Sequence, residues 1–163
     1  MTIYVTVSPI SQFDEWDYSY DSKYDTLWVE RIPRNFPQTT LQGAYNLIIK
    51  IDASKLISYF ETITVAGVGY WNVTSPLELP KPMVGQLQIA RDIDDGQPQA
   101  YFTNPDYSVF YTRLGEPVDT AKLQHVAIGQ QIIVDVTQDG MLAGVWMSDL
   151  PVELRDKYVM KSV

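Results

Sequence analysis

The stretch IIVDVTQDGMLAGV, residues 132–145, decides the fold. Up to residue 136 its apolar side chains alternate with a period of two, which is the pattern of a half-buried β-strand. The tetrad Thr137–Gly140 interrupts the alternation, and Gly140 can adopt the positive φ that a tight hairpin turn requires. A weaker copy of this pattern begins at residues 47–51 and turns at Asp52–Lys55. The sequence therefore predicts two β-hairpins, one in each half of the chain.

Other segments predict further strands and one helix. Short runs rich in β-branched and aromatic residues, which suit a pleated surface, occur at Thr2–Val7, Thr26–Ile32, Gln86–Ala90 and Tyr107–Leu114. A helix is predicted over Val152–Tyr158, with Pro151 in its first turn. We expect a mainly β fold, β-rich α+β in class, with one short C-terminal helix.

The two halves of the chain form an internal repeat. A shift of 82 residues aligns Val5–Val7 with Leu87–Ile89 and Leu27–Ile32 with Val109–Leu114. The shift becomes 85 residues where 47–51 align with 132–136, and 86 residues where Phe60 aligns with Trp146. The shift changes in loops, where insertions are tolerated.

The repeat defines the expected domain organisation. Residues 1–74 form the first β repeat, 75–83 a proline-rich connector, and 84–163 the second β repeat with the helix. We expect each repeat to be a mainly antiparallel meander of about four strands. Their apolar faces should pack together as a sandwich or half-barrel, so that both repeats form one globular unit.

Two motifs stand at opposite ends of the repeats. The first repeat carries YDSKYDTLWV at Tyr20–Val29, and the second carries the hairpin stretch at 132–145. Both resemble the bacterial family called domain of unknown function 2283, of which this chain would be a tandem relative. Residues 102–107 lack the two aspartates of that family's opening motif. Lys55 and Ser58 replace family glycines, so the first hairpin is expected to turn differently. The resemblance implies a small β-sheet module and no activity.

Composition excludes several kinds of function. The chain has 163 residues, 45% of them hydrophobic, which excludes a disordered protein. Its net charge of −8 argues against a nucleic acid partner. Because it has no cysteine, disulfides and thiolate metal sites are impossible. We find no signal peptide, membrane segment or phosphate loop, so we expect a cytoplasmic protein with no membrane partner and no cofactor.

Two residue patterns have a chemical and a structural interpretation. Residues 135–142 resemble the start of a calcium loop, but Trp146 stands where the last carboxylate ligand should be, so a plain hairpin without metal is favoured. His125 is the single histidine and could be a general base. It has no partner nearby in the sequence, and no Gly-x-Ser-x-Gly elbow occurs, so a structural or surface role is favoured.

Trp16, Tyr18 and Tyr20 are the candidate binding residues. On a strand they would project from one face, with acidic residues on the other. At a shift of 82, the matching residues of the second repeat are smaller: Pro98, Ala100 and Phe102. The three aromatic side chains therefore fill a gap between the repeats or form an exposed patch for a ligand or partner, and packing is favoured.

Three functions remain open at this level. A non-enzymatic protein-interaction or scaffold module, using an acidic and aromatic face, is favoured because no catalytic set of residues is recognised. An acidic inhibitor or immunity-type protein that masks a basic partner fits the net charge of −8. A carboxylate-based hydrolase of a small molecule or sugar would use acids near Trp16 and Tyr20. Free sheet edges also allow self-association.

Overall fold

The computed structural model describes residues 2–33, 37–42, 47–63, 71–73, 77–93 and 97–161. The first half contains strands β1 (Thr2–Pro9), β2 (Glu15–Asp21), β3 (Thr26–Ile32), β4 (Thr39–Gln42), β5 (Leu47–Ile51), β6 (Ile57–Ile63) and β7 (Trp71–Val73). The second half contains β8 (Met83–Ile93), β9 (Gln99–Thr103), β10 (Phe110–Leu114), β11 (Leu123–Gly129), β12 (Ile132–Thr137) and β13 (Leu142–Met147). Its helices are the 3-10 helix η1 (Thr120–Lys122) and the α-helix α1 (Val152–Lys161). The expected mainly β fold with a short C-terminal helix is confirmed.

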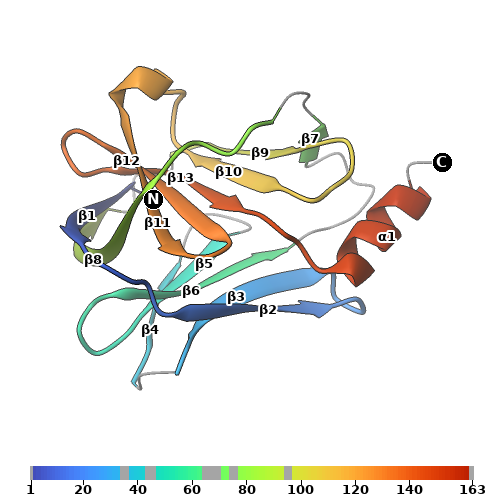
Figure 1. The fold of residues 1–163 in the computed structure, drawn as a ribbon, viewed down its shortest axis with the longest axis horizontal. Coiled ribbons are helices and arrows are strands. Elements are labelled where there is room, and N and C mark those ends of the chain that lie inside the picture. Colours follow the sequence, from blue (N-terminus) through green and yellow to red (C-terminus); the bar gives the residue numbers. More distant parts are fainter. Residues whose placement is uncertain are drawn as a thin grey trace.

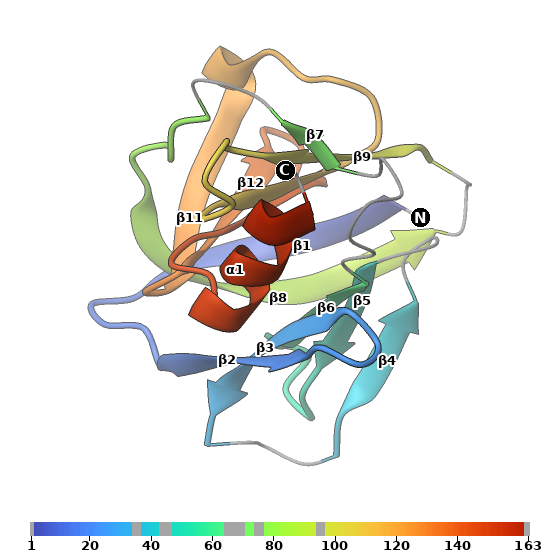
Figure 2. The same ribbon diagram turned by 90° about the vertical axis from the view of Figure 1, so that its right-hand side faces the viewer.

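The strands form two sheets that face each other (Figure 1). The large sheet has the order β1-β8-β11-β12-β13-β10-β9-β7, and the small sheet has the order β2-β3-β6-β5-β4. Helix α1 lies at one end of the sandwich, between the layers (Figure 2). Within the described part of the chain, no helix is long and apolar enough to cross a membrane.

The sheet order shows the repeat directly. The small sheet runs β2-β3-β6-β5-β4, and the large sheet contains β9-β10-β13-β12-β11 in the same relative order. Each unit has five strands rather than about four, because β4 also pairs with β5 in the small sheet and β11 also pairs with β12 in the large sheet. The second strand of each unit pairs with the fifth, β3 with β6 and β10 with β13, so strand order in space departs from strand order in sequence.

The leading strands β1 and β8 join the two repeats. They pair antiparallel, with Val5 opposite Ile89 and Val7 opposite Leu87. Since the shift of 82 matches Val5 to Leu87 and Val7 to Ile89, this register is symmetric about the position where Thr6 faces Gln88. This pairing agrees with the predicted equivalence of β1 and β8, and β1 belongs to the large sheet together with the strands of the second half of the chain.

The expected shift of 86 after the hairpin turn is wrong. Ile49 faces Phe60 in the first hairpin, and Val134 faces Val145 in the second, so Phe60 corresponds to Val145 at a shift of 85. A slip of one residue moves a strand side chain to the opposite face of its sheet. Phe60 and Val145 are both buried between the sheets, whereas Trp146 belongs to a separate apolar cluster.

A similar slip affects the second strand of each unit, β3 and β10. Val29 faces Phe60 and Thr112 faces Val145, so the shift here is 83 instead of 82. The strands Leu27–Ile32 and Val109–Leu114 are equivalent, but the expected shift of 82 matched residues that point into the core with residues that point outward. With the corrected shift, the residues matching Trp16, Tyr18 and Tyr20 are Gln99, Tyr101 and Thr103.

The two hairpins turn in the same way, contrary to the expectation for the first. Lys55 has φ of 61°, close to the 87° of Gly140. The Lys55 N–H donates to the Asp52 carbonyl at 2.9 Å, and the Gly140 N–H donates to the Thr137 carbonyl at 3.0 Å. The Asp52 side chain also accepts from the Ser54 N–H at 2.8 Å. Local hydrogen bonds therefore hold a lysine in the backbone conformation that glycine adopts without strain.

Substitutions at these turns test the common backbone. Gly140→Ala should lower the free energy of unfolding by about 1–2 kcal/mol, because an L residue is strained at positive φ. Its Cβ would also lie 2.9 Å from the Val5 carbonyl oxygen. Lys55→Gly should leave stability unchanged or raise it, since relief of strain offsets the added freedom of the unfolded chain. Urea denaturation measures the free energy of unfolding of both variants, and an equal loss of stability in the two would contradict a shared turn.

Candidate functional site

Trp16, Tyr18 and Tyr20 pack between the sheets instead of forming an open patch. Trp16 is 5% exposed and stacks on Phe60 with ring centroids 6.2 Å apart. The Tyr18 hydroxyl donates to the Ser148 carbonyl at 2.8 Å, and the Tyr20 hydroxyl donates to Asp25 Oδ1 at 2.8 Å. The Tyr18 hydrogen bond attaches β2 to the second repeat, and the other two contacts lie within the first repeat.

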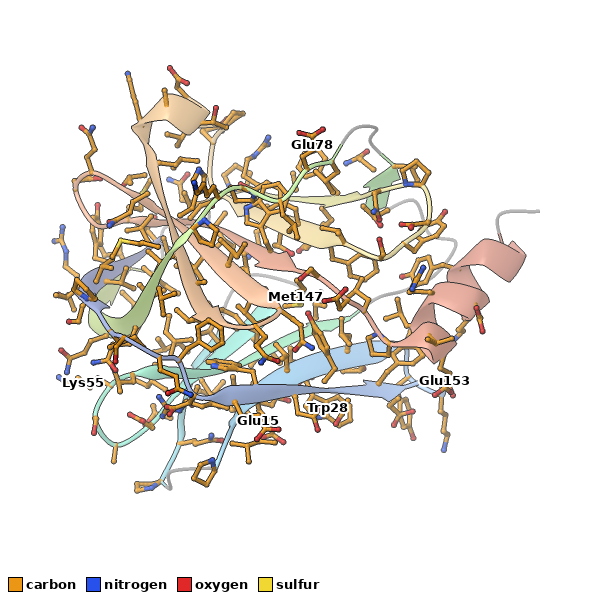
Figure 3. All side chains as sticks on the ribbon, in the orientation of Figure 1. Glu15, Trp28, Lys55, Glu78, Met147 and Glu153 are labelled. Carbon is orange, nitrogen blue, oxygen red and sulfur yellow. The ribbon has the colours of Figure 1, made fainter. Side chains whose placement is uncertain are left out.

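The cavity of interest lies on the other side of the molecule, over the outer face of the large sheet. Its volume is about 430 Å³, within the range of small-molecule sites. Its lining comes from the sheet and from two covering segments, and includes Leu77, Glu78, Pro80, Phe102, Tyr111, Arg113, Glu116, Pro117, Val118, Thr120, Leu123, His125, Asp135, Ala143 and Trp146. Figure 3 shows Glu78 on this outer side, while Met147 points between the sheets.

Strand register arranges the outer face of the large sheet in two rows, and the cavity lies over part of both. The polar row, read across neighbouring strands, is Arg113, Gly144, Asp135 and His125. The adjacent row is aromatic at one end and aliphatic at the other, and it consists of Phe102, Tyr111, Trp146, Ile133 and Ala127. Both rows point outward because the residues between them, such as Val134 and Val145, fill the core between the sheets.

Asp135 is the centre of the polar row. It is 1% exposed, and its Oδ2 accepts from Trp146 Nε1 at 3.0 Å. Its Oδ1 lies 2.7 Å from His125 Nδ1. Because an ionised carboxylate only accepts hydrogen bonds, Nδ1 must carry the proton. In the neutral ring, Nε2 is therefore a hydrogen-bond acceptor.

Tyr111 lies beside this carboxylate. Its ring stacks on Trp146 with centroids 4.2 Å apart and on Phe102 at 6.0 Å. A Cβ on Gly144 would lie 2.5 Å from the Tyr111 ring, so only glycine lets the ring cross this strand toward Asp135. Burial, and then the charge of Asp135 and a hydrogen bond to it, raise the pKa of Tyr111 well above its usual range. The phenol therefore keeps its proton.

Arg113 supplies the positive charge at the other end of the polar row. Its guanidinium carbon is 5.7 Å from the centroid of the Phe102 ring, and its Nε donates to the Gly115 carbonyl at 3.3 Å. Glu78 and Glu116 are exposed residues of the lining. Of the described lining residues, Arg113 is the only lysine or arginine.

The equivalent face of the first repeat has a different chemistry. Strand register matches Asp135 to Lys50, Trp146 to Glu61, and His125 to Thr40. Lys50 Nζ lies 4.1 Å from the centroid of the Tyr59 ring, whose hydroxyl donates to Glu61 at 2.5 Å. The fold therefore forms without a histidine–aspartate pair at these positions, and the pair is a particular feature of the second repeat.

Sequence reasoning missed Asp135 as the partner of His125. The pattern placed this aspartate in a turn motif, and Thr137–Gly140 is indeed a hairpin turn. Asp135 itself lies on β12, a strand buried on both faces. An acid within such an apolar run was the available signal, because a buried carboxylate needs donors. Among the residues that the structure describes, no group of three His, Asp or Glu could hold a metal ion.

No protein-family model matches the chain, and no curated protein matches it. The cavity offers three chemical elements: a row of stacked aromatic rings, an oriented imidazole and one guanidinium.

The raised pKa of Tyr111 predicts an alkaline loss of stability. The unfolded phenol releases its proton near its usual value of 10.0, while the folded one retains it. The resulting stabilisation is present below about pH 10 and is lost as the pH rises above it. Above pH 10, the free energy of unfolding of the wild type should fall more steeply than that of Tyr111→Phe, by about 1.4 kcal/mol per pH unit. Urea denaturation from pH 8 to 11 measures the slopes, and parallel curves throughout would contradict the prediction.

Proposed function

We propose that the protein is a binding module for a small, planar organic molecule held in the cavity over the large sheet. The observation that carries this proposal is the acceptor geometry of His125, fixed by the buried Asp135 in a largely aromatic and aliphatic lining. Few polar groups at defined positions in an apolar cavity are typical of small-molecule sites.

The aromatic row favours a flat ligand. Phe102, Tyr111 and Trp146 stack in sequence across three strands, with centroid separations of 6.0 and 4.2 Å. A planar ring system can extend this series, because offset stacking of aromatic faces adds attraction beyond the area buried. Leu77 and Ala143 supply aliphatic contacts in the same lining.

The polar row favours a hydrogen-bond donor on that ligand. In the described part of the chain, His125 Nδ1 is bonded to Asp135 and no donor reaches Nε2. A ligand O–H or N–H would satisfy this acceptor. The carboxylates Glu78 and Glu116 and the net charge of −8 disfavour a free anion. A neutral phenol-like molecule therefore fits best.

The naphthalene ring provides a direct test. 2-Naphthol should bind about fivefold more tightly than 2-methoxynaphthalene, which lacks the donor for His125, because one hydrogen bond contributes about 1 kcal/mol. In NMR titrations the indole N–H signal of Trp146 should shift, while that of Trp28, on the outer face of the small sheet, should not. Equal affinities, or shifts of both signals, would contradict the proposed site.

A second candidate function uses the outer face of the small sheet. There, the half-buried Trp28 lies directly opposite Glu61, and Asp17 lies directly opposite Glu30. An acidic face around an aromatic side chain suits a basic protein surface, as in an inhibitor that masks its target. Charge attraction of this kind weakens with salt.

Two double variants of equal charge test this candidate. A lysine- and arginine-rich peptide should lose affinity for Asp17→Asn/Glu61→Gln, and this loss should shrink as salt is added. Glu78→Gln/Glu116→Gln changes the net charge equally on the opposite face and should bind the peptide like the wild type. If calorimetry shows the same loss for both, only the overall charge acts and this face is no docking site.

A further inference from the structure

We propose that His125 is a general base that hydrolyses an aryl ester bound in this cavity, with water as the co-reactant. The inference rests on the proposed function, since the aryl group would occupy the aromatic row described above. The proposed hydrolysis adds an activity to a binding site, and the substrate class is aryl esters.

The imidazole of His125 has the orientation that a general base needs. A histidine base needs its far nitrogen unprotonated and directed to the reacting group, and it needs its near nitrogen held by an acid. Asp135 holds Nδ1 at 2.7 Å, and its own side chain is only 2% exposed. The His125 side chain is 20% exposed, so water can reach it. When Nε2 takes a proton, the carboxylate stabilises the imidazolium that forms.

The reaction balances with water alone. A water molecule donates a proton to Nε2 as its oxygen forms a bond to the ester carbonyl carbon, giving a tetrahedral intermediate. The intermediate then expels the aryl oxygen by breaking the carbon–oxygen bond. The imidazolium returns its proton to that oxygen, which leaves as a phenol, and the other product is a carboxylic acid. The released phenol O–H then faces Nε2, which is the contact argued for a bound ligand.

Arg113 is the group that can stabilise the negative charge on the carbonyl oxygen of the intermediate. It stands on the same register row as His125, three strands away, or about 14 Å between backbones at the usual strand spacing. Both side chains line one cavity, and the guanidinium lies near Phe102, on the side of β10 away from His125, so its charge acts across the cavity. In the described part of the chain, no carboxylate forms an ion pair with Arg113. Its positive charge is therefore available to an oxyanion.

Asp135 has a positioning role that can be separated from folding. In Asp135→Asn, the amide oxygen can still accept a hydrogen bond from Trp146, but the amide nitrogen now donates toward His125 Nδ1. Nδ1 then becomes the acceptor and Nε2 carries the proton, so the ring loses its basic nitrogen toward the substrate. The side-chain volume is unchanged, and the fold should be kept.

The experiment follows the hydrolysis of 2-naphthyl acetate by the fluorescence of released 2-naphthol. His125→Gln and Asp135→Asn should each lower kcat by about 100-fold. Thr40→Ala, at the position equivalent to His125 on the small sheet, should retain the full rate. The wild-type rate should rise with pH to a plateau, since only the neutral imidazole accepts a proton, and this rise should disappear in both variants. Circular dichroism and 2-naphthol binding by His125→Gln report whether the fold and cavity persist.

The outcomes separate the two proposals. Loss of hydrolysis in folded His125→Gln that still binds 2-naphthol supports the general base. If the wild type binds 2-naphthol but any hydrolysis is independent of His125, the general-base proposal is wrong and the binding function stands. A pH profile in Asp135→Asn identical to that of the wild type overturns the positioning role. If 2-naphthol does not bind the wild type, the proposed function fails and the inference fails with it.

Discussion

The packing of two apolar faces against each other holds this molecule together. Strands β3, β5 and β6 bury residues such as Leu27, Ile49 and Phe60, and strands β10, β12 and β13 oppose them with residues such as Val134 and Val145. Sheet faces can differ in this way because successive side chains of a strand point to opposite sides. Inward positions are therefore constrained by the core, and outward positions are left to other chemistry.

The outward positions are where the two repeats have diverged. On the small sheet they carry charged and aromatic residues in contact with solvent, including Lys50 and Glu61. On the large sheet they carry Asp135 and Trp146, and Leu77 and Phe13 pack against the apolar cluster that contains Trp146. Strand β13 is consequently buried on both faces. A carboxylate in such a place must receive hydrogen bonds, and this requirement fixes the orientation of His125.

Much of the fold could be predicted from the sequence because strand periodicity and turn chemistry are local signals. The hairpin at Thr137–Gly140 and the equivalence of β1 with β8 required no long-range information. The exact register did, since a slip of one residue keeps the alternating pattern but exchanges the faces. Burial of Val29 and Thr112 resolves that choice, and it is a tertiary property. The same limit concealed the candidate site: His125 and Asp135 are ten residues apart and meet only because β11 and β12 pair.

The symmetric pairing of β1 with β8 bears on why the two equivalent outer faces can differ, with the cavity over the large sheet. Two identical chains clasped through that strand pair would be related by a twofold axis, and every change on one outer face would be copied onto the other. Such a homodimer would carry two cavities or none. Joining the units in a single polypeptide removes this obligation, so one outer face can specialise while its twin stays polar.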